Sequence, residues 1–371
     1  MLERIRIKNF RCFSEFELDL TGLNSCVILG RNGSGKTTIA SVIQILQNMA
    51  WKTSRVGDLL KPSDISRSSD GSVSFNLDVR LFDKNYNYNI AFELPDRFHE
   101  LRVADESLSV DSEIVYTRHT SQIALNRSQM RDAQFGVDWH VVALPIIQTS
   151  SSRDPIAIFK EWLKNIVVVR PVPACMKGES DGVTLIPNEY VDNFGEWFSG
   201  VLAESPSSYE PFIEFLREVM PDISSVKNRI LGLDIRSLEV EFRVKSESFS
   251  VPFGRLSDGE KCFFVCALIV AMASEKLGMT CFWDEPDNYL APQEVSPTML
   301  ALRRSFQSGR QIIITSHNAD AIRCFSDDNT IVLTRSSHLA PPVAEMLSDL
   351  HRKSNITGSA INLWLRGDLD K

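Results

Sequence analysis

The sequence predicts an α/β fold, and three observations indicate it. A glycine-rich loop, GRNGSGKTT at residues 30–38, lies between an apolar strand-like run and a segment whose apolar residues recur at helical spacing. The last third of the chain alternates strand-like and helical segments, as α/β domains do. Residues 73–117 instead show the period of two that half-buried strands have. We therefore expect a mixed core sheet with helices, plus an antiparallel β subdomain.

Alternation and apolar spacing place the individual elements along the chain. Strands are expected at 2–10, 16–20, 26–29, 73–82, 88–94, 101–110, 114–117 and 230–244, with an exposed serine-rich loop at 63–74. Helices are expected at 38–50, 154–165, 188–201 and 209–219. The last third predicts helix 258–277, strand 279–283, helix 292–308 and strands 311–315 and 330–334. Four aromatic residues fall on apolar helical faces and are expected in the core rather than on a base-stacking platform: Trp162, Phe194, Trp197 and Phe198.

Composition indicates an ordinary globular chain. Of its 371 residues, 43% are hydrophobic and 24% charged, enough for one large domain or two smaller ones. No apolar run is long enough to span a bilayer, and the N-terminal MLERIRIKNF is charged and strand-like rather than a signal peptide. We therefore expect a cytoplasmic protein with no membrane partner. The net charge of −8 argues against a general nucleic-acid coat but leaves a local basic groove open.

The seven cysteines form no CxxC pair, and most lie in apolar surroundings, as Cys26 and Cys281 do. We expect reduced, buried thiols. Cys262 and Cys266 lie one helical turn apart, but no further ligands follow at a recognisable spacing, so core packing explains them better than a metal site. The six histidines form no metal-like cluster either.

The glycine-rich loop fits the phosphate-binding pattern G-x-x-x-x-G-K-[ST], with Gly30, Gly35, Lys36 and Thr37 at the fixed positions. Glycines let successive N–H groups turn towards an anion, and the following helix directs its positive end to the same point. The lysine adds an ammonium group for the β- and γ-phosphates, and the threonine hydroxyl can ligate Mg²⁺. A chance glycine turn of this pattern is expected in roughly one such chain in a hundred, so the loop predicts nucleotide binding.

Two acids and a histidine follow apolar strands in the last third. Asp284 can hold Mg²⁺ beside a phosphate loop, and Glu285 can accept a hydrogen bond from an attacking water. The alternative is an acidic pair that caps a turn before a proline, and the phosphate loop upstream favours the metal-and-base interpretation. His317 could bond a γ-phosphate, although a lone histidine at a strand end is normally a surface residue.

Ser257 and Gly259 lie where the long apolar helix begins. A serine N-cap followed by glycine is common for capping alone. The same arrangement is a second anion site, because a hydroxyl, a glycine N–H and the helix dipole point outward together. One chain cannot easily bring two such sites to one triphosphate, whereas two chains that face each other could.

The ordered set GRNGSGKTT, LSDGE, CFWDEP and TSHN resembles the ABC-type ATPases, within the branch that includes RecF, the SMC and Rad50 heads and the overcoming-lysogenization-defect (OLD) ATPases. The chain is most similar there to the short AAA-21-like ATPases of bacterial anti-phage systems, and its opening IRIKNFRCF resembles the first strand and turn of the branch. Transporter nucleotide-binding domains fit less well, because more than two hundred positions separate Lys36 from Ser257. The resemblance implies an ABC-type P-loop ATPase head, with an N-terminal lobe at 1–118, an inserted, largely helical arm at 119–245 and a C-terminal lobe at 246–371.

The resemblance also assigns roles to matching residues. The Walker A loop that binds ATP would comprise Gly30, Asn32, Gly33, Ser34, Gly35, Lys36, Thr37 and Thr38. Thr37 and the Walker B residue Asp284 would bind Mg²⁺, Glu285 would be the catalytic base and His317 the switch histidine. Ser257 and Gly259 would form the signature, which acts on the ATP of a second chain.

Three further positions fit the family less clearly. Residues 288–291 fall where the D-loop lies, but Ala291 stands where many relatives carry histidine or aspartate. Gln148 is a candidate for the Q-loop glutamine. Arg55 lies where SMC-like heads place an arginine near the γ-phosphate or DNA, and a solvated surface arginine explains it equally well.

The resemblance implies an ATPase that forms a homodimer or higher oligomer around ATP and Mg²⁺. It could regulate a separately encoded effector, such as a nuclease or toxin, in anti-phage defence, or it could clamp DNA in genome maintenance as RecF-like heads do. The acidic balance and the lack of a coiled coil favour the first role. A third possibility is that turnover is negligible and ATP only locks an oligomer.

The segment after His317 is expected to add no catalytic domain. Residues 318–371 hold no acidic metal cluster of the kind a nuclease needs. The apolar cluster at 361–365 could dock a partner, although packing on its own domain explains it better.

Overall fold

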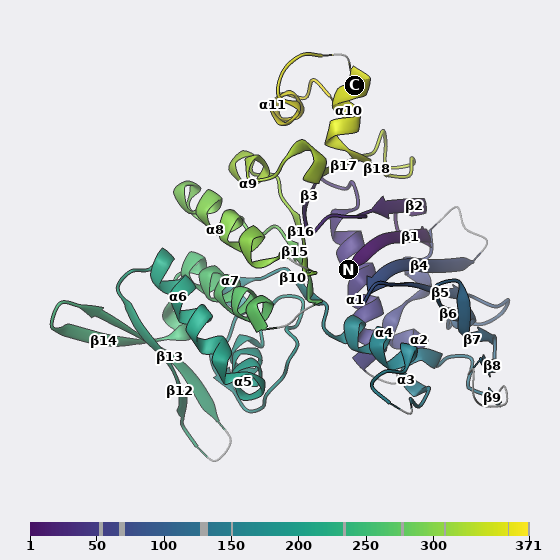
Figure 1. The fold of residues 1–371 in the computed structure, drawn as a ribbon, viewed down its shortest axis with the longest axis horizontal. Helices are drawn as coiled ribbons and strands as arrows, with labels where there is room; N and C mark the ends of the chain where they lie inside the picture. The colour runs from purple at the N-terminus through teal and green to yellow at the C-terminus, as the bar shows by residue number, and fades with distance from the viewer. Residues whose placement is uncertain are drawn as a thin grey trace. The chain divides into compact units, whose positions relative to one another are not determined.

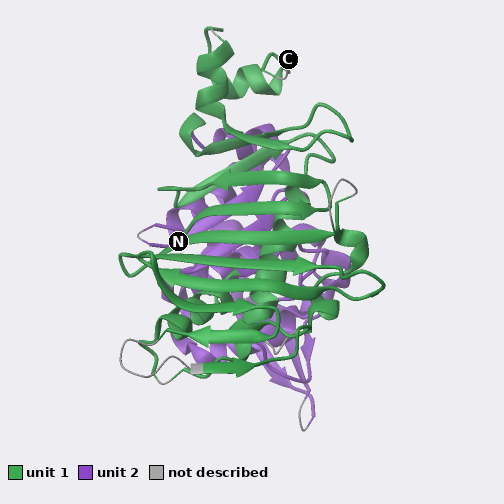
Figure 2. Ribbon diagram, turned by 90° about the vertical axis from the view of Figure 1, so that its right-hand side faces the viewer, with its two compact units in different colours: residues 1–166, 327–371 green, residues 167–326 purple. Residues whose placement is uncertain are grey.

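The structure, a computed structural model drawn in Figure 1, describes residues 1–51, 55–66, 71–126, 133–149, 151–232, 235–275, 278–307, 309–354 and 356–369. The chain divides into two compact units: unit 1 comprises residues 1–166 and 327–371, and unit 2 comprises residues 167–326 (Figure 2). These bounds differ from those of the expected lobes and arm, because contacts rather than motif positions define the units. The division into two lobes and an arm stays a prediction.

Unit 1 contains an eight-stranded antiparallel sheet with the order β2-β1-β4-β5-β6-β7-β8-β9. Its strands are β1 (Leu2–Phe10), β2 (Phe13–Asp19), β4 (Ser72–Leu81), β5 (Lys84–Glu93), β6 (Arg102–Val110), β7 (Glu113–His119), β8 (Gln122–Leu125) and β9 (Ala133–Gly136). Apolar residues alternate along the long strands, so one face is buried. Helix α4 (Pro155–Lys164) packs on this face, where the Phe159 ring stacks on Tyr86 with ring centroids 6.2 Å apart.

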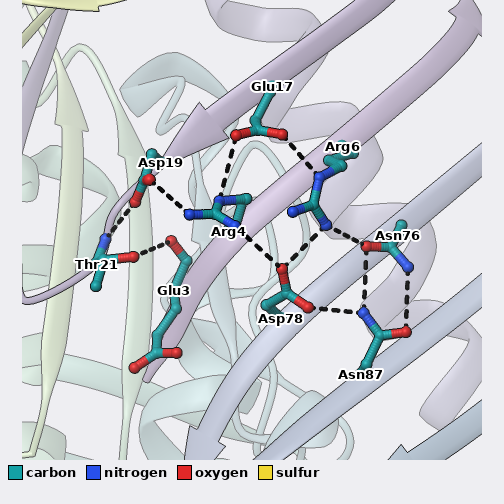
Figure 3. Close-up of polar contacts among 9 residues, drawn as sticks. All are labelled: Glu3, Arg4, Arg6, Glu17, Asp19, Thr21, Asn76, Asp78 and Asn87. Atoms are coloured by element: carbon teal, nitrogen blue, oxygen red, sulfur yellow. Dashed lines mark hydrogen bonds and ion pairs between the residues drawn. The ribbon is translucent and has the colours of Figure 1, made fainter. Parts of the chain in front are cut away.

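The opposite face of this sheet is polar along β1, β2 and β4. The Arg4 guanidinium pairs with Glu17, Asp19 and Asp78, and Arg6 pairs with Glu17 and Asp78 (Figure 3). The charged groups alternate in sign across the strands, which favours this register over its neighbours. Because the side chains are partly exposed, we expect each pair to contribute little to stability.

The glycine-rich loop of unit 1 follows a buried parallel strand. Strand β3 (Ser25–Gly30) pairs in parallel with β17 (Thr330–Thr334), and β18 (Val343–Met346) pairs antiparallel with β17. Helix α1 (Lys36–Trp51) follows the loop and buries an apolar stripe, as its spacing predicts. The other helices of the unit are α2 (Val56–Leu59), α3 (Ala143–Ile146), α10 (Leu347–Ser354) and α11 (Ala360–Leu365), with 3₁₀ turns at Pro62–Asp64 and Asp327–Asn329.

Unit 2 has a parallel sheet whose middle strand ends at the acidic motif. Strands β10 (Val167–Val169), β15 (Thr280–Asp284) and β16 (Gln311–Thr315) lie in that order, and every side chain in them is buried. Strands that are covered on both faces read as continuous apolar runs, which explains why this pattern was visible in the sequence. The helices of this part are α7 (Asp258–Glu275), α8 (Pro292–Ser305) and α9 (Ala319–Arg323).

A second sheet of unit 2 packs with two amphipathic helices. Its strands are β11 (Glu179–Ser180), β12 (Ile223–Ile230), β13 (Arg236–Val244) and β14 (Glu247–Pro252), and its helices are α5 (Phe194–Glu204) and α6 (Tyr209–Val219). Three 3₁₀ turns, at Pro173–Cys175, Pro206–Ser208 and Phe253–Arg255, complete the unit. The Phe194 ring stacks on Phe253 with centroids 4.7 Å apart. The four aromatic residues expected in the core are all buried.

Two expected elements are wrong in detail. Most of the strand expected at 230–244 is β13, which begins only at Arg236. Ile230 instead ends β12, because the chain turns at Gly232 and the Leu231 N–H donates to the Ile235 carbonyl. The helix expected at 188–201 begins only at Phe194. Asn193 accepts a hydrogen bond from the Asn188 N–H, so the asparagine side chain competes with helix formation there.

Other expectations agree or fall partly outside the described residues. The expected helix 258–277 ends at Glu275, and its last two residues lie outside the described part of the chain, as do residues 67–70 of the serine-rich loop. Ile361 and Leu363 of the C-terminal cluster are buried, in agreement with packing on the chain itself. None of the helices in the described ranges combines the length and apolar character that a membrane crossing requires.

Candidate functional site

The glycine-rich loop joins β3 to α1 in unit 1 and depends on two left-handed glycines. Gly33 has φ +80° and Gly35 has φ +107°, a region that side chains other than glycine rarely adopt. A Cβ at Gly35 would also lie 2.7 Å from the Phe13 ring, so β2 closes over the loop at that point. The sequence pattern therefore reflects both backbone conformation and close packing.

The polar groups of the loop suit an anion. The Lys36 side chain is buried, and its ammonium donates to the carbonyls of Gly30 at 2.8 Å and Arg31 at 3.4 Å. The Ser34 hydroxyl is buried without a hydrogen-bond partner among the described residues. Helix α1 begins at Lys36 and carries no acidic residue in its first turn, so its positive end is not neutralised locally. A cation, a buried donor and a helix N-terminus together fit a phosphate group.

Asp284 and Glu285 of unit 2 are joined through one hydroxyl. Asp284 ends β15 opposite Thr315, the last residue of β16, and both side chains are buried. The Thr315 hydroxyl donates to Asp284 Oδ1 and accepts a hydrogen bond of 3.0 Å from the Glu285 N–H. The hydroxyl thus orients the carboxylate that the sequence assigns to Mg²⁺ and fixes the backbone of the next acid.

Glu285 has a left-handed backbone conformation, and its side chain is partly exposed to solvent. Its φ is +56°, which is uncommon for a residue other than glycine and concentrates at functional sites. The Asn288 amide donates to Glu285 Oε2 at 2.6 Å, and His317 Nε2 lies 3.6 Å from Oε1. Both side chains remain partly exposed, 31% for Glu285 and 40% for His317. A carboxylate held by two polar neighbours and open to solvent is suited to accept a proton from water.

The Ser257 and Gly259 pair forms the start of α7 in unit 2. The Ser257 N–H donates to the Glu260 carboxylate at 2.7 Å, and the Glu260 N–H donates back to the Ser257 hydroxyl at 3.3 Å, which is a capping box. A Cβ at Gly259 would lie 3.0 Å from the Tyr289 carbonyl, so the helix start approaches the segment after the acidic pair. Ser257 is exposed. Within this chain its hydroxyl caps a helix, and the expected role on a second chain's ATP stays a prediction.

The structure brings together one part of the expected site within each unit. The Walker A residues lie in unit 1. Asp284, Glu285 and His317 gather at the carboxyl ends of β15 and β16 in unit 2, which also contains the signature residues. No group of three or more His, Cys, Asp or Glu side chains in the described part of the chain forms a metal cluster. Mg²⁺ often keeps several waters and takes only one or two protein ligands. The assignment of Thr37 and Asp284 to Mg²⁺ stays a prediction.

Sequence reasoning missed two residues that contact the acids. Thr315 was read only as the end of an apolar strand, and Asn288 only as part of a D-loop segment. The signal that could have found Thr315 is the pairing of equal-length apolar strands that both end in a polar residue. Asn288 follows Glu285 by three residues, a spacing that short turns bring together.

The structure bears on Arg55 but leaves the expected role of Gln148 untested. Arg55 makes a two-pronged ion pair with Glu100 of unit 1, at 2.9 and 3.2 Å, so its guanidinium is occupied by a carboxylate. That pair supports the surface interpretation of Arg55 in this conformation. Gln148 follows α3 and is exposed. Its role as the Q-loop glutamine stays a prediction.

Comparisons with known proteins give the family and the fold of the chain. The profile of the RecF/RecN/SMC N terminal domain matches residues 1–338. The OLD nuclease of Thermus scotoductus is 42% identical over 55 residues, a match that covers 15% of this chain and only 10% of that protein.

Two solved structures show the fold. An SmcHead bound to the C-winged helix domain of ScpA is 15% identical, with a TM-score of 0.54 over 95% of this chain and 99% of that one. An Smc head with an extended coiled coil, bound to the C-terminal domain of ScpA derived from Pyrococcus furiosus, is 12% identical, with a TM-score of 0.53 over 95% and 98%. The expected fold class, an ABC-type ATPase head of mixed α/β structure, is confirmed. With nearly its whole length matched by the profile, the chain belongs to the RecF/RecN/SMC N terminal domain family.

Proposed function

We propose that the chain binds and hydrolyses ATP and that two copies close around the nucleotide. The observation that carries the proposal is the conformation of the glycine-rich loop, with two left-handed glycines, a buried lysine and an unpartnered buried serine hydroxyl at the start of α1. Membership of the RecF/RecN/SMC family supports the same activity.

ATP is held by the Walker A loop in this proposal. The Lys36 ammonium leaves its bonds to the loop carbonyls for the β- and γ-phosphates, and the loop N–H groups and the Ser34 hydroxyl donate to phosphate oxygens. Thr37 and Asp284 would hold Mg²⁺, which would supply charge neutralisation on the phosphates. Asp284 is oriented for this by the Thr315 hydroxyl.

Glu285 acts on the attacking water. Its carboxylate accepts the water proton while Asn288 and His317 hold it in place, and His317 is the second group near the terminal phosphate. In phosphoryl transfer most of the catalysis comes from positioning and charge stabilisation. A carboxylate with two fixed neighbours meets the positioning requirement.

The second chain supplies the signature. Ser257 and Gly259 are placed at the exposed start of α7, where a hydroxyl, a glycine N–H and a helix N-terminus converge. ATP therefore stabilises a closed dimer or higher oligomer, and hydrolysis releases it. The chain then works as a switch.

Two substitutions test the ATPase. Lys36→Ala is expected to lose ATP binding, whereas Glu285→Gln is expected to bind ATP, to lose turnover by about 10²-fold or more and to accumulate as a dimer. The measurements are ATP affinity, phosphate release and mass by light scattering with and without ATP. Asp349→Asn, on the surface of α10, is a control. Hydrolysis by Glu285→Gln at the wild-type rate would show that the base assignment is wrong. A fully active monomer at saturating ATP would exclude the proposal that two copies close around the nucleotide.

We further propose that the switch regulates a separately encoded effector, such as a nuclease or toxin, in bacterial anti-phage defence. The match to an OLD nuclease over a short segment and the resemblance to solved heads that carry a bound ScpA domain support an ATPase that works with partner domains. Co-purification with the product of a neighbouring gene, released when ATP is hydrolysed, would support this role. An ATP-dependent, salt-sensitive shift of duplex DNA without such a partner would favour a DNA clamp instead.

A further inference from the structure

The turn that follows β17 lies against the glycine-rich loop. Strands β3 and β17 run in parallel with Gly30 opposite Leu333, so the segments after both strands begin at the same edge. A Cβ at Gly30 would lie 2.8 Å from the Leu333 carbonyl, which shows how closely β17 approaches the start of the loop. Nothing in the sequence motifs points to residues 335–340.

Arg335 fastens this turn to the loop. Its Nη1 donates to the Gly33 carbonyl at 2.9 Å, its Nη2 to the His338 carbonyl at 2.6 Å and its Nε to the Ala340 carbonyl at 2.8 Å. All three guanidinium nitrogens therefore donate to carbonyl oxygens. Only a planar fork with donors in several directions can make such a set of bonds, and lysine cannot replace it.

The peptide unit between Gly33 and Ser34 makes hydrogen bonds through both its carbonyl and its N–H, and Arg335 donates to the carbonyl. The N–H of the same unit, that of Ser34, donates to the Arg31 carbonyl at 3.1 Å. Gly33 itself is in the left-handed region, where glycine has more freedom than any other residue. Without Arg335, this peptide unit would keep the bond of the local turn among the residues that the structure describes, and the loop would sample more conformations.

We propose that Arg335 is a positioning residue that holds the nucleotide loop in its binding conformation. This inference rests on the proposed ATP binding by the loop. Because three of its five N–H groups, one on each nitrogen, already donate to carbonyls of the loop and the turn, Arg335 acts through the loop rather than as a phosphate ligand. A loop that is already ordered loses less freedom when ATP binds, so the effect falls on affinity and not on the chemical step.

Nucleotide binding gives the first test. Kd for a fluorescent ATP analogue, KM and kcat are measured for the wild type, Arg335→Ala, Arg335→Lys and the control Arg352→Ala, whose guanidinium pairs with Asp349 on α10. We expect Kd and KM of Arg335→Ala to rise by about tenfold or more, kcat to change by less than about twofold, and Arg335→Lys to stay impaired. An unchanged Kd in Arg335→Ala, or full rescue by lysine, would overturn the proposal.

Hydrogen exchange of the nucleotide-free chain gives the second test. We expect amides of residues 31–36 to exchange faster in Arg335→Ala than in the wild type or in Arg352→Ala. If Arg335→Ala exchanges at the wild-type rate while the wild type binds ATP, the positioning role is wrong and the proposed function stands. If the wild type binds no ATP, the proposed function itself is wrong. If the alanine variant does not fold, Arg335→Gln, which keeps one donor group, is judged by the same exchange criterion.

Discussion

Thr315 donates a hydrogen bond to Asp284 between the ends of two parallel strands, and the same hydroxyl receives the Glu285 N–H. One side chain thus links the carboxylate assigned to Mg²⁺ with the backbone of the assigned base. Thr315→Val keeps the shape and removes the hydroxyl, which leaves the buried Asp284 carboxylate without that donor. We expect kcat to fall by ~10–100-fold and the Mg²⁺ requirement to rise, with recovery in Thr315→Ser.

A neighbouring threonine provides the control for this experiment. Thr280 is buried at the other end of β15, and its hydroxyl has no hydrogen-bond partner among the described residues. Thr280→Val makes the same chemical change in the adjacent strand of the same sheet and is expected to leave turnover unchanged. Equal losses in the two variants would mean that packing, and not the bond to Asp284, explains the result.

A buried charge cluster in unit 1 leads to a stability prediction. Glu106 of β6 is fully buried and accepts hydrogen bonds from Tyr88, Tyr116 and the N–H groups of Ala143 and Leu144. Burial and the nearby Glu106 charge raise the pKa of both tyrosines well above their usual value, so they stay protonated donors. The cluster ties the sheet to α3, two residues before Gln148.

Glu106→Leu removes the acid and leaves the buried guanidinium of Arg118 without its counter-charge, 3.7 Å away in the native chain. We expect a loss of about 3–5 kcal/mol in the free energy of unfolding, measured by denaturant titration. Glu17→Ala on the polar face of the same sheet removes a partly exposed ion-pair partner and should cost at most about 1 kcal/mol. A loss of similar size in both variants would show that the buried cluster does not anchor the sheet.

The sequence could predict the strands that carry the site because they are buried on both faces. Residues 312–314 and 331–333 are continuous apolar runs, and β16 and β17 begin and end at the expected residues, 311–315 and 330–334. The expected strand 230–244 begins too early, at the last residue of β12, because the turn before β13 interrupts the pattern over only a few residues. Local pattern gives the type of an element more reliably than its pairing.

The contacts around the site were harder to predict, since they join residues that are distant in sequence. Arg335 reaches Gly33 across 302 positions, and no spacing rule connects them. Glu285 and Asp284 were identified from a motif, but the left-handed backbone of Glu285 and its bond to Thr315 depend on the register of β15 with β16. Such contacts follow from topology, which single-sequence patterns do not contain.

The cysteines give a prediction about reactivity. Burial raises the pKa of the Cys26 thiol to about 12, and burial together with the nearby Asp258 charge raises that of Cys262 to about 12. Burial also raises the pKa of the Cys266 and Cys281 thiols. Cys175 is exposed in the turn before Met176. Because the thiolate is the reactive form, we expect iodoacetamide at pH 8 to modify Cys175 first.

Mass spectrometry of peptides checks this order. Cys12, which is partly exposed, should follow Cys175, and the buried cysteines should react only after denaturation. The control is the same labelling in guanidinium chloride, where every cysteine is expected to react. Rapid labelling of Cys266 in the native chain would mean that α7 opens more readily than its burial suggests.

Asp287 leads to a prediction about pH. It lies two residues after Glu285, is buried, and one of its carboxylate oxygens has no hydrogen-bond partner among the described residues. Desolvation raises the pKa of its carboxyl above the ordinary value of 3.8, the Glu285 charge adds to this, and a hydrogen bond from Ser316 opposes it only in part. Above its folded pKa, Asp287 is therefore a buried charge that weakens the fold.

The sign follows from proton binding. Between the unfolded and the folded pKa the folded chain binds more protons, so the contribution of Asp287 to stability falls as pH rises through that window. Asp287→Asn removes the charge, and we expect this variant to be more stable than the wild type at pH 7–8, with a gap that narrows as pH falls towards 4. Denaturant titrations across this range measure the gap, with Asp96→Asn at an exposed turn as the control. A gap that is constant with pH would mean that Asp287 does not titrate in the window, and a less stable variant at pH 7 would mean that its carboxylate makes a contact the amide cannot replace.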